Sequence, residues 1–421
     1  MSEVSMGKTI IEKIIARHCR EKVTPGKVVW VDIDLRTARD FGGANVVENF
    51  RRNYHEDRVA DAAKTFFAFD CVAPANNIPY ANNQQICRDF AQQQGIKVFD
   101  VDQGIGSHIL IDKGLCLPGY IAVGTDSHLN LLGALGALGQ GMGDVDIAFA
   151  FKTGKTWFEV PETIKVVVKG KLSPPVSAKD LTLAVLKRLG SKGALGKAIE
   201  FCGEAIDSLS LDGRITLASM VTEMGGIVGF ITPNQEVLAY CRARAGKEDI
   251  EAITADPDAH YCQTIDIDIS GLKPQISLPY YPSKVANVDE VEGERVNSIF
   301  LGSCTNGRWE DFKMVAFILK GKKVHEGVMF KAVPSTREVY GRLLKKGLAD
   351  VLFDAGVILT SSGCGGCASG QVGMTGEGEV QLSTGNRNFK GKQGAGKTFL
   401  VSPATAAVSA LYGKITSPDK V

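Results

Sequence analysis

The chain has 421 residues, 44% of them hydrophobic, which is enough for two or three domains with cores of their own. Its 48 lysine and arginine residues balance 47 aspartate and glutamate residues, which argues against nucleic acid or an anionic membrane surface as a partner. It contains no apolar run of about 18 residues, as a membrane span needs, and its start lacks the apolar core of a signal peptide. Ten cysteines are too sparse for a disulfide scaffold, so we expect a soluble, cytoplasmic protein with thiols free to bind metal.

The first part of the chain alternates between helical and strand patterns. Four isoleucines give residues 8–20 the pattern of an amphipathic helix, and a second helix is expected over residues 81–94. Strands are expected over residues 28–35, 65–70, 97–101 and 120–124. A glycine- and alanine-rich stretch over residues 133–143 then permits close packing. This alternation predicts a mostly parallel, doubly wound sheet.

The rest of the chain suggests two further units. A strand is expected over residues 164–171, after which Pro174-Pro175 marks a boundary. Residues 274–294 are rich in proline, lack periodicity and resemble a linker, and the strand–loop–helix rhythm returns after residue 295. Further helices are expected over residues 178–189 and 214–223. We therefore expect three α/β domains, over residues 1–172, 173–285 and 286–421.

Three cysteines lie in two polar, glycine-rich loops that follow expected strands. The strand over residues 296–301 leads into the loop of Cys304, and the apolar segment over residues 351–360 leads into the loop of Cys364 and Cys367. Open α/β sheets bind ligands at such carboxyl ends of strands. A C-x-x-C pair alone is ambiguous among zinc, a redox dithiol and an iron–sulfur cluster, and buried structural thiols with a chance pair are the alternative without metal.

The number of ligands narrows this choice. A structural zinc ion takes four ligands, and an electron-transfer cluster is usually held by four thiolates. Three thiolates on a [4Fe–4S] cluster leave one iron without a protein ligand, and such an iron can act as a Lewis acid. A zinc-binding protein remains the second interpretation, and it would be colourless.

Around these loops the chain resembles the aconitase superfamily. The resemblance runs from about residue 6 to about residue 414 and is strongest in four short motifs. These are GTDSH at residues 124–128, GSCTNG at 302–307, GCGGC at 363–367 and NRNF at 386–389. By its length and by Arg308 after the second motif, the chain looks most like the large subunits of 3-isopropylmalate dehydratase and homoaconitase.

The resemblance implies three doubly wound α/β domains around a [4Fe–4S] cluster. It also implies a hydro-lyase that dehydrates or hydrates a 2- or 3-hydroxy dicarboxylic acid, with 3-isopropylmalate or another alkyl-substituted malate as the best single substrate. The alternatives are a homoaconitase- or aconitase-like activity, and a catalytically silent iron–sulfur or RNA-binding relative. A separate small subunit with a swivelling domain is expected to close the site, because single-chain relatives have a fourth domain for which this chain has no residues.

The resemblance also implies cluster ligands, catalytic residues and substrate-binding residues in this chain. The cluster ligands are Cys304, Cys364 and Cys367. The catalytic residues are His128, paired with Glu223, together with Asp126, Asp70 and His108. The substrate-binding residues are Arg387, Arg39, Ser127, Asn306 and Lys392. Without the resemblance, residues 126–128 are a helix-capping turn and Arg387 is an ordinary solvated loop residue.

The chain departs from the family pattern at several of these positions. Cys71 stands where relatives have histidine, and a thiol cannot carry a proton as a cation. A family histidine is expected at Ser107, with His108 one place later. Arg39 replaces glutamine or histidine, and Lys392 replaces a second arginine. The altered proton relay indicates either a changed substrate or a loss of activity.

Two further stretches allow more than one interpretation. The leucines at positions 129, 131 and 132 could line a pocket for an alkyl group, or they could pack a helix onto the sheet. Residues 391–398 match the phosphate-binding pattern G-x-x-x-x-G-K-T. That pattern needs a helix beginning at the lysine, whereas residues 399–403 look like a strand ended by proline, so nucleotide binding is not expected.

Overall fold

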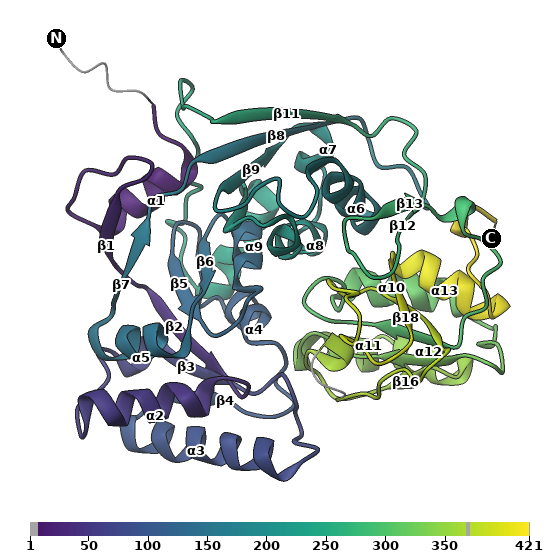
Figure 1. The fold of residues 1–421 in the computed structure, drawn as a ribbon, viewed down its shortest axis with the longest axis horizontal. Coiled ribbons are helices and arrows are strands. Elements are labelled where there is room, and N and C mark those ends of the chain that lie inside the picture. The colour runs from purple at the N-terminus through teal and green to yellow at the C-terminus, as the bar shows by residue number, and fades with distance from the viewer. Residues whose placement is uncertain (1–6, 368–370, 421) are drawn as a thin grey trace.

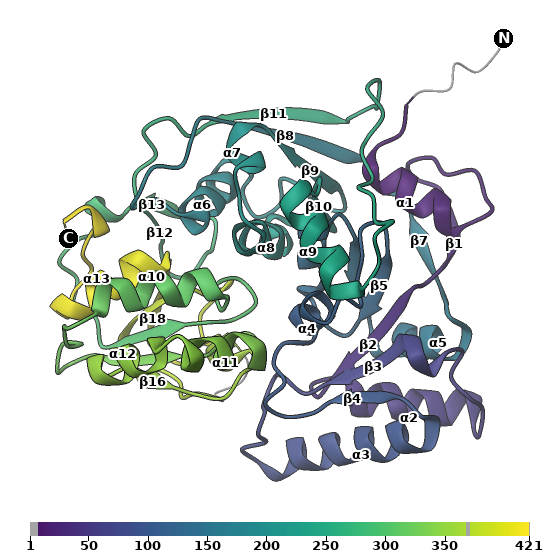
Figure 2. The same cartoon turned by 180° about the vertical axis from the view of Figure 1, so that it is seen from behind.

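The structure is a computed structural model that describes residues 7–367 and 371–420. Three separate groups of parallel strands organise it (Figure 1). Figures 1 and 2 show the first and third groups on opposite sides of the molecule, with the second group spanning the space above them. None of the helices in the described ranges combines the length and apolarity needed to cross a bilayer.

The first sheet contains five parallel strands in the order β4-β3-β2-β5-β6. Its strands are β2 (Leu35–Arg39), β3 (Thr65–Ala68), β4 (Lys97–Phe99), β5 (Ile121–Gly124) and β6 (Leu138–Gly141). Its helices are α2 (Gly43–Tyr54), α3 (Ile78–Gln94), α4 (Gly106–Asp112) and α5 (Asp144–Thr153), with a 3-10 segment η2 (Leu129–Leu135). The adjacent Phe66 and Phe67 point into different cores, as expected for a strand covered on both faces.

Local sequence signals define the ends of α3. Asn77 caps its start by accepting a hydrogen bond of 3.0 Å from the backbone amide of Tyr80. Pro79 occupies the first turn, where a missing amide costs nothing. Gly95 ends the helix with a φ of +72°, a conformation that glycine adopts without a steric penalty. This helix carries Tyr80 and Gln84 toward the region described below.

The second sheet has four parallel strands in the order β10-β9-β8-β11. They are β8 (Thr163–Lys169), β9 (Ala198–Cys202), β10 (Val228–Ile231) and β11 (Gln263–Asp268). The accompanying helices are α6 (Ala178–Leu189), α7 (Glu204–Asp207), α8 (Leu211–Ser219), η3 (Val221–Met224) and α9 (Gln235–Ala245). Outside these sheets, α1 (Ile10–His18) packs near the antiparallel pair β1 (Val28–Asp32) and β7 (Lys155–Glu159).

The third sheet has seven strands in the order β13-β12-β18-β17-β14-β15-β16, of which the last five are parallel. Those five are β14 (Ser298–Leu301), β15 (Met329–Ala332), β16 (Ile358–Leu359), β17 (Val380–Ser383) and β18 (Lys397–Val401). The antiparallel edge consists of β12 (Gln275–Ser277) and β13 (Val285–Asn287). The helices are α10 (Trp309–Leu319), α11 (Arg337–Lys345), α12 (Leu348–Ala355) and α13 (Pro403–Tyr412), with short 3-10 turns η4 (Val288–Glu290), η5 (Gly365–Cys367) and η6 (Pro418–Lys420). A further 3-10 turn, η1 (Ala62–Lys64), precedes β3 of the first sheet.

The parallel strands of the first and third sheets follow the same scheme. Numbered within each sheet, both read 3-2-1-4-5, and the second sheet follows the same order with four strands. This order defines a doubly wound fold, so the predicted fold class is confirmed. The domain boundaries at residues 172 and 285 stay a prediction; β8 lies before the first boundary but pairs within the second sheet, and β12 lies before the second boundary but pairs within the third.

Two local expectations meet different outcomes. The strand expected over residues 28–35 is split, because Asp34 leaves the strand to bond the backbone of Ile121 and the ring of His18. β1 therefore pairs with β7, and β2 enters the first sheet. The residues that match the phosphate-binding pattern form turns followed by β18, which begins at Lys397, so this lysine starts a strand and not the helix that the pattern needs.

A buried arginine joins the three groups. Arg308, which precedes α10, pairs through Nη1 with Asp112 of α4 at 2.7 Å and through Nε with Asp212 of α8 at 2.9 Å. Thr336, at the start of α11, donates to the other oxygen of Asp112 at 2.8 Å. Arg308 therefore binds the first, second and third groups together at one point.

Candidate active site

The strand order places two sets of loops around one cavity. Arg39 ends β2 and residues 125–128 follow the neighbouring β5, which is where the strand order of the first sheet reverses. In the third sheet, Cys304 follows β14 and Arg387 follows the neighbouring β17, at the equivalent reversal. Ligands of doubly wound sheets bind at such points.

The cavity between these loops has a volume of about 280 Å³. Its charged and polar lining from the first sheet consists of Arg39, Cys71, Thr125, Asp126, Ser127 and His128. The third sheet contributes Ser303, Cys304, Cys364, Cys367, Arg387 and Lys392. Three larger side chains complete it: Phe41, Tyr80 and Ile105. Most of the residues predicted to form the site are thus brought together.

The three cysteines predicted as cluster ligands all line this cavity with free thiols. Burial raises the pKa of the Cys304 thiol well above its usual value, and each of the other two sulfurs adds to the effect. Burial also raises the pKa of Cys367, against the opposing influence of Lys392 and Arg387. Gly365 allows the tight turn. Its φ is +58°, and a Cβ at this position would lie 2.7 Å from a methyl group of Val333.

This donor set fits an iron–sulfur cluster. Three thiols from two loops converge on one side of a cavity, and Lys392 and Arg387 favour the thiolate form of Cys367 against the effect of burial. Asn386 contacts the set from its own side of the cavity, since its Oδ1 accepts hydrogen bonds of 3.3 Å from both the Cys304 thiol and the hydroxyl of Ser303. Asn386 lies within the fourth family motif, but no role was predicted for it.

Arg39 connects the carboxylates of the first sheet to the cysteine loop. Its Nε donates to Asp70 at 2.6 Å, its Nη1 to Asp126 at 2.9 Å and its Nη2 to Cys364 Sγ at 2.7 Å. Burial raises the pKa of Asp70 to about 6, although Arg39 opposes this. Burial also acts to raise the pKa of Asp126, but Arg39 and His128 outweigh it and the net shift is downward.

His128 and Glu223 form the predicted pair across two sheets. His128 Nε2 lies 3.1 Å from Glu223 Oε1, and the hydroxyl of Ser127 lies 3.3 Å from His128 Nδ1. Arg387 Nε donates to the same Glu223 oxygen at 2.7 Å. Burial opposes ionisation of Glu223, but His128 and Arg387 lower its pKa overall. In the described part of the chain, Glu223 Oε2 is buried without a hydrogen-bond partner.

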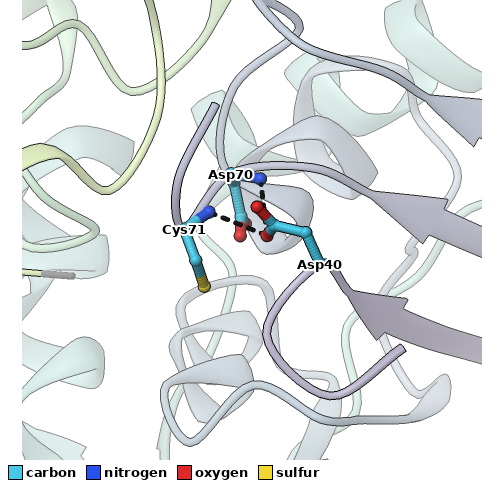
Figure 3. Close-up of side chains that lie close together, drawn as sticks. All are labelled: Asp40, Asp70 and Cys71. Carbon is cyan, nitrogen blue, oxygen red and sulfur yellow. Dashed lines mark hydrogen bonds between the residues drawn. The ribbon is translucent and has the colours of Figure 1, made fainter. Parts of the chain in front are cut away.

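Asp40 fixes the loop that carries Asp70 and Cys71 (Figure 3). Its carboxylate accepts hydrogen bonds from the backbone amides of residues 70, 71 and 72 at 3.1, 2.9 and 3.0 Å, and another from Gln84 Nε2 at 3.2 Å. Ligand atoms of Asp40, Asp70 and Cys71 lie within 4.8 Å of one another, but these amides occupy the oxygens of Asp40. We therefore assign Asp40 a supporting role, which its position just after a strand could have suggested.

Four predicted residues are not part of the cavity lining. Asp70 and Glu223 bond to lining residues, Arg39 in one case and His128 and Arg387 in the other. His108 is buried behind the loop of Cys304, with Nε2 3.0 Å from the carbonyl oxygen of Cys304. Burial, assisted by Arg308, lowers its pKa to about 4. The adjacent Ser107 instead reaches Asp126 Oδ2 at 3.4 Å. Asn306 donates to Asp311 at 2.9 Å and borders a different cavity of about 330 Å³.

The structure decides between the two interpretations of the leucines after His128, and it adds Lys179 to the residues that support the site. Leu129, Leu131 and Leu132 are buried in the core and do not line the cavity, so the packing alternative holds for them. Lys179, on α6, is fully buried and donates to the carbonyl oxygens of residues 384 and 385 at 3.0 and 2.8 Å. Burial lowers its pKa to about 7. Lys179 thereby anchors the loop of Arg387. No feature of the sequence around Lys179 predicts this role.

Comparison with known proteins agrees with this geometry. A family model described as the aconitase family (aconitate hydratase) matches residues 12–413. A probable 3-isopropylmalate dehydratase large subunit from Methanothermobacter thermautotrophicus is 44% identical over 420 residues, covering 99% of this chain and all of that protein. The 3-isopropylmalate dehydratase large subunit 1 of Methanopyrus kandleri is 42% identical over 416 residues, covering 98% and 99% of the two chains.

Among solved structures, Thermococcus kodakaraensis aconitase X in its holo form matches with a TM-score of 0.51 at 14% identity. The match covers 85% of this chain and 84% of that one, and at this identity it concerns the fold. The family match and the nearly full-length similarity confirm the resemblance, the aconitase-type α/β fold and the hydro-lyase class predicted from the sequence. The chain belongs to the aconitase family.

Proposed function

We propose that this chain is the large subunit of an iron–sulfur hydro-lyase acting on a hydroxy dicarboxylic acid, with 3-isopropylmalate as the first substrate to test. One observation carries the proposal: the three thiols, His128 of the acid–base pair and three cationic side chains line one cavity of about 280 Å³. The relatives named above are 3-isopropylmalate dehydratase large subunits, which supports this substrate.

Cys304, Cys364 and Cys367 would hold the [4Fe–4S] cluster. When bound, the cluster supplies an iron without a protein ligand, whose Lewis acidity weakens the bond to a substrate hydroxyl. The remaining chemistry belongs to the side chains. His128 is held through Nε2 by Glu223, which leaves Nδ1, beside the hydroxyl of Ser127, to exchange a proton with the departing hydroxyl group.

Arg387 and Lys392 would bind substrate carboxylates. Arg387 uses Nε for Glu223, and within the described ranges its two Nη groups form no hydrogen bond, so a fork remains for an oxygen pair. Lys392 adds a point charge on the same side of the cavity. Phe41, Tyr80 and Ile105 supply apolar surface, against which an alkyl group is favourable and a third carboxylate is not.

A separate small subunit would cover the cavity. The names of the relatives as large subunits support a partner of this kind. Phe41, which lines the cavity, is 65% exposed, and Phe389, in the loop between Arg387 and Lys392, is 46% exposed. Aromatic side chains at a cavity mouth suit an interface that excludes water when it closes.

The test is an anaerobic assay of the reconstituted chain, alone and with its small subunit, against alkyl-substituted malates and citrate. We expect little turnover from the chain alone. With the partner, kcat/KM for alkylmalates should exceed that for citrate by about tenfold or more, about 1.4 kcal/mol. Equal use of citrate would indicate an aconitase-like enzyme. An intact cluster without activity on any diacid would indicate a silent relative, and a colourless, zinc-loaded chain would exclude the iron–sulfur interpretation.

A further inference from the structure

Arg39 is held by three groups of the protein. Each of its three guanidinium nitrogens donates to a different acceptor: Asp70, Asp126 and Cys364 Sγ, at 2.6, 2.9 and 2.7 Å. Its side chain is only 13% exposed. The three bonds use three of its five N–H groups and fix the guanidinium against Cys364 Sγ, a role that was not predicted from the sequence.

The sulfur of Cys364 is surrounded by residues of the first sheet. The thiol of Cys71 forms a second side-chain hydrogen bond with it. The backbone amide of Cys364 donates to the carbonyl oxygen of Asp70 at 2.8 Å. The amide of Cys71 is itself fixed by Asp40 at 2.9 Å. Cys304 is different, because its sulfur meets an amide oxygen from its own sheet.

We propose that Arg39 is a positioning residue for the metal-binding sulfur of Cys364, and that Cys71 is a second donor to this sulfur. The inference rests on the proposed function, since it requires a metal on Cys364. Hydrogen bonds to a thiolate stabilise its charge, raise the reduction potential of the metal centre and increase metal affinity. Asp70 and Asp126 hold the guanidinium of Arg39 in place, so its positive charge stays beside the sulfur of Cys364.

Iron retention and reduction potential test this role directly in the full-length, anaerobically reconstituted chain. Arg39→Gln removes the positive charge and most of the donors. We expect iron retention against a chelator to fall about 10- to 100-fold, with a more negative midpoint potential. Arg36→Gln is the matched control, because Arg36 is a buried arginine of the same strand that bonds the carbonyl oxygen of Asp61 outside the cavity. It should retain iron as the unmodified chain does.

Cys71 provides an independent variant if Arg39→Gln does not fold. Cys71→Ala removes one donor and no charge, so it should weaken iron retention in the same direction but less. Cys71→Ser keeps a hydroxyl donor and should recover part of the loss. The iron content per chain is measured for each variant. Loss of a cluster ligand lowers the iron content itself, whereas loss of a hydrogen-bond donor only weakens iron retention.

Two results would overturn the inference. If Arg39→Gln kept its iron and its midpoint potential while KM rose, Arg39 would be a substrate ligand. If Cys71→Ala lost one iron per chain, Cys71 would be a cluster ligand and not a donor. Failure of the unmodified chain to take up iron is a separate outcome, read before any variant is compared, and it would refute the proposed function itself.

Discussion

The two sides of the cavity are built on sheets with the same strand order, but one side carries charged side chains and the other carries thiols. The charged wall consists of Arg39, Asp70, Asp126 and His128 from the first sheet, and the thiol wall consists of Cys304, Cys364 and Cys367 from the third. Arg39 and His128 follow β2 and β5, and Cys304 follows β14 beside β17, where the strand orders reverse. Asp70 follows β3, and Cys364 and Cys367 follow the edge strand β16. The backbone scheme therefore determines where a site can form, and the loop residues determine its chemistry.

The walls also differ in how they are stabilised. The charged wall pairs its own groups, as Arg39 does with two aspartates. The thiol wall depends on the other side, because Cys364 accepts from Arg39 and the carbonyl oxygen of Cys304 meets His108. The ligand loops are therefore held partly by a sheet that is hundreds of residues away in sequence. Changes in one wall should therefore be detectable in the other.

The largest effect is expected from removing a ligand of the thiol wall. Cys364→Ser should prevent cluster assembly and reduce turnover by about a thousandfold, the several kcal/mol that a catalytic metal supplies. Iron content, visible absorption and kcat measure this. Cys262→Ser is the control, since Cys262 is an exposed free cysteine outside the cavity. A Cys364→Ser chain with its full iron content would refute the ligand assignment.

His128→Asn breaks the acid–base pair of the charged wall without touching a thiol. Because His128 is held by Glu223 and faces the cavity, kcat should fall about 100- to 10,000-fold, the usual contribution of a positioned acid–base group. Iron content should be unchanged. Steady-state kinetics and iron analysis of the same preparation test this. Unchanged kcat would remove His128 from the mechanism.

Substitution of Lys392 tests whether this cationic side chain beside the thiol wall binds the substrate. Lys392→Met should raise KM for a diacid about tenfold with little change in kcat, since one charged contact with a substrate is worth roughly 1.5 kcal/mol. Lys390→Met is the matched control, because Lys390 is an exposed neighbour that does not line the cavity. Equal effects of the two substitutions would mean that general charge, and not a contact in the cavity, determines KM.

The smallest effect is expected from a histidine that belongs to neither wall. Burial acts to lower the pKa of His18, but its hydrogen bond with Asp34 outweighs this and the net pKa is raised. The pair therefore stabilises the fold fully below the unfolded-state pKa of about 6.5, and this contribution is lost as the pH rises through the folded-state value.

His18→Gln should remove this dependence on pH. The free energy of unfolding from denaturant titrations, measured on both sides of neutral pH, is the test. The pH profile of kcat should be the same for the variant and the unmodified chain, because His18 lies outside the cavity. A change in that profile would show that the walls are not the only source of its pH dependence.

Much of the fold and part of the site could be predicted from the sequence. Alternating strands and helices gave the doubly wound class, and strand ends followed by glycine and cysteine gave the thiol wall. The supporting contacts were not predictable, because they join residues far apart in the chain. Arg39 and Cys364 are separated by 325 positions, and no local pattern shows that their side chains meet. The leucines after His128 had two equivalent interpretations, since leucine serves cores and pockets alike.

The arginine that joins the three groups has a consequence for how the protein unfolds. Arg308 is buried, and its two carboxylate partners come from the first and second groups. Detaching either group alone would remove one of the two carboxylates that compensate this buried charge, and breaking a buried ion pair costs about 3–5 kcal/mol. Partial unfolding is therefore penalised, and the chain should melt in a single calorimetric transition. Replacing Arg308 by methionine should separate that transition into more than one.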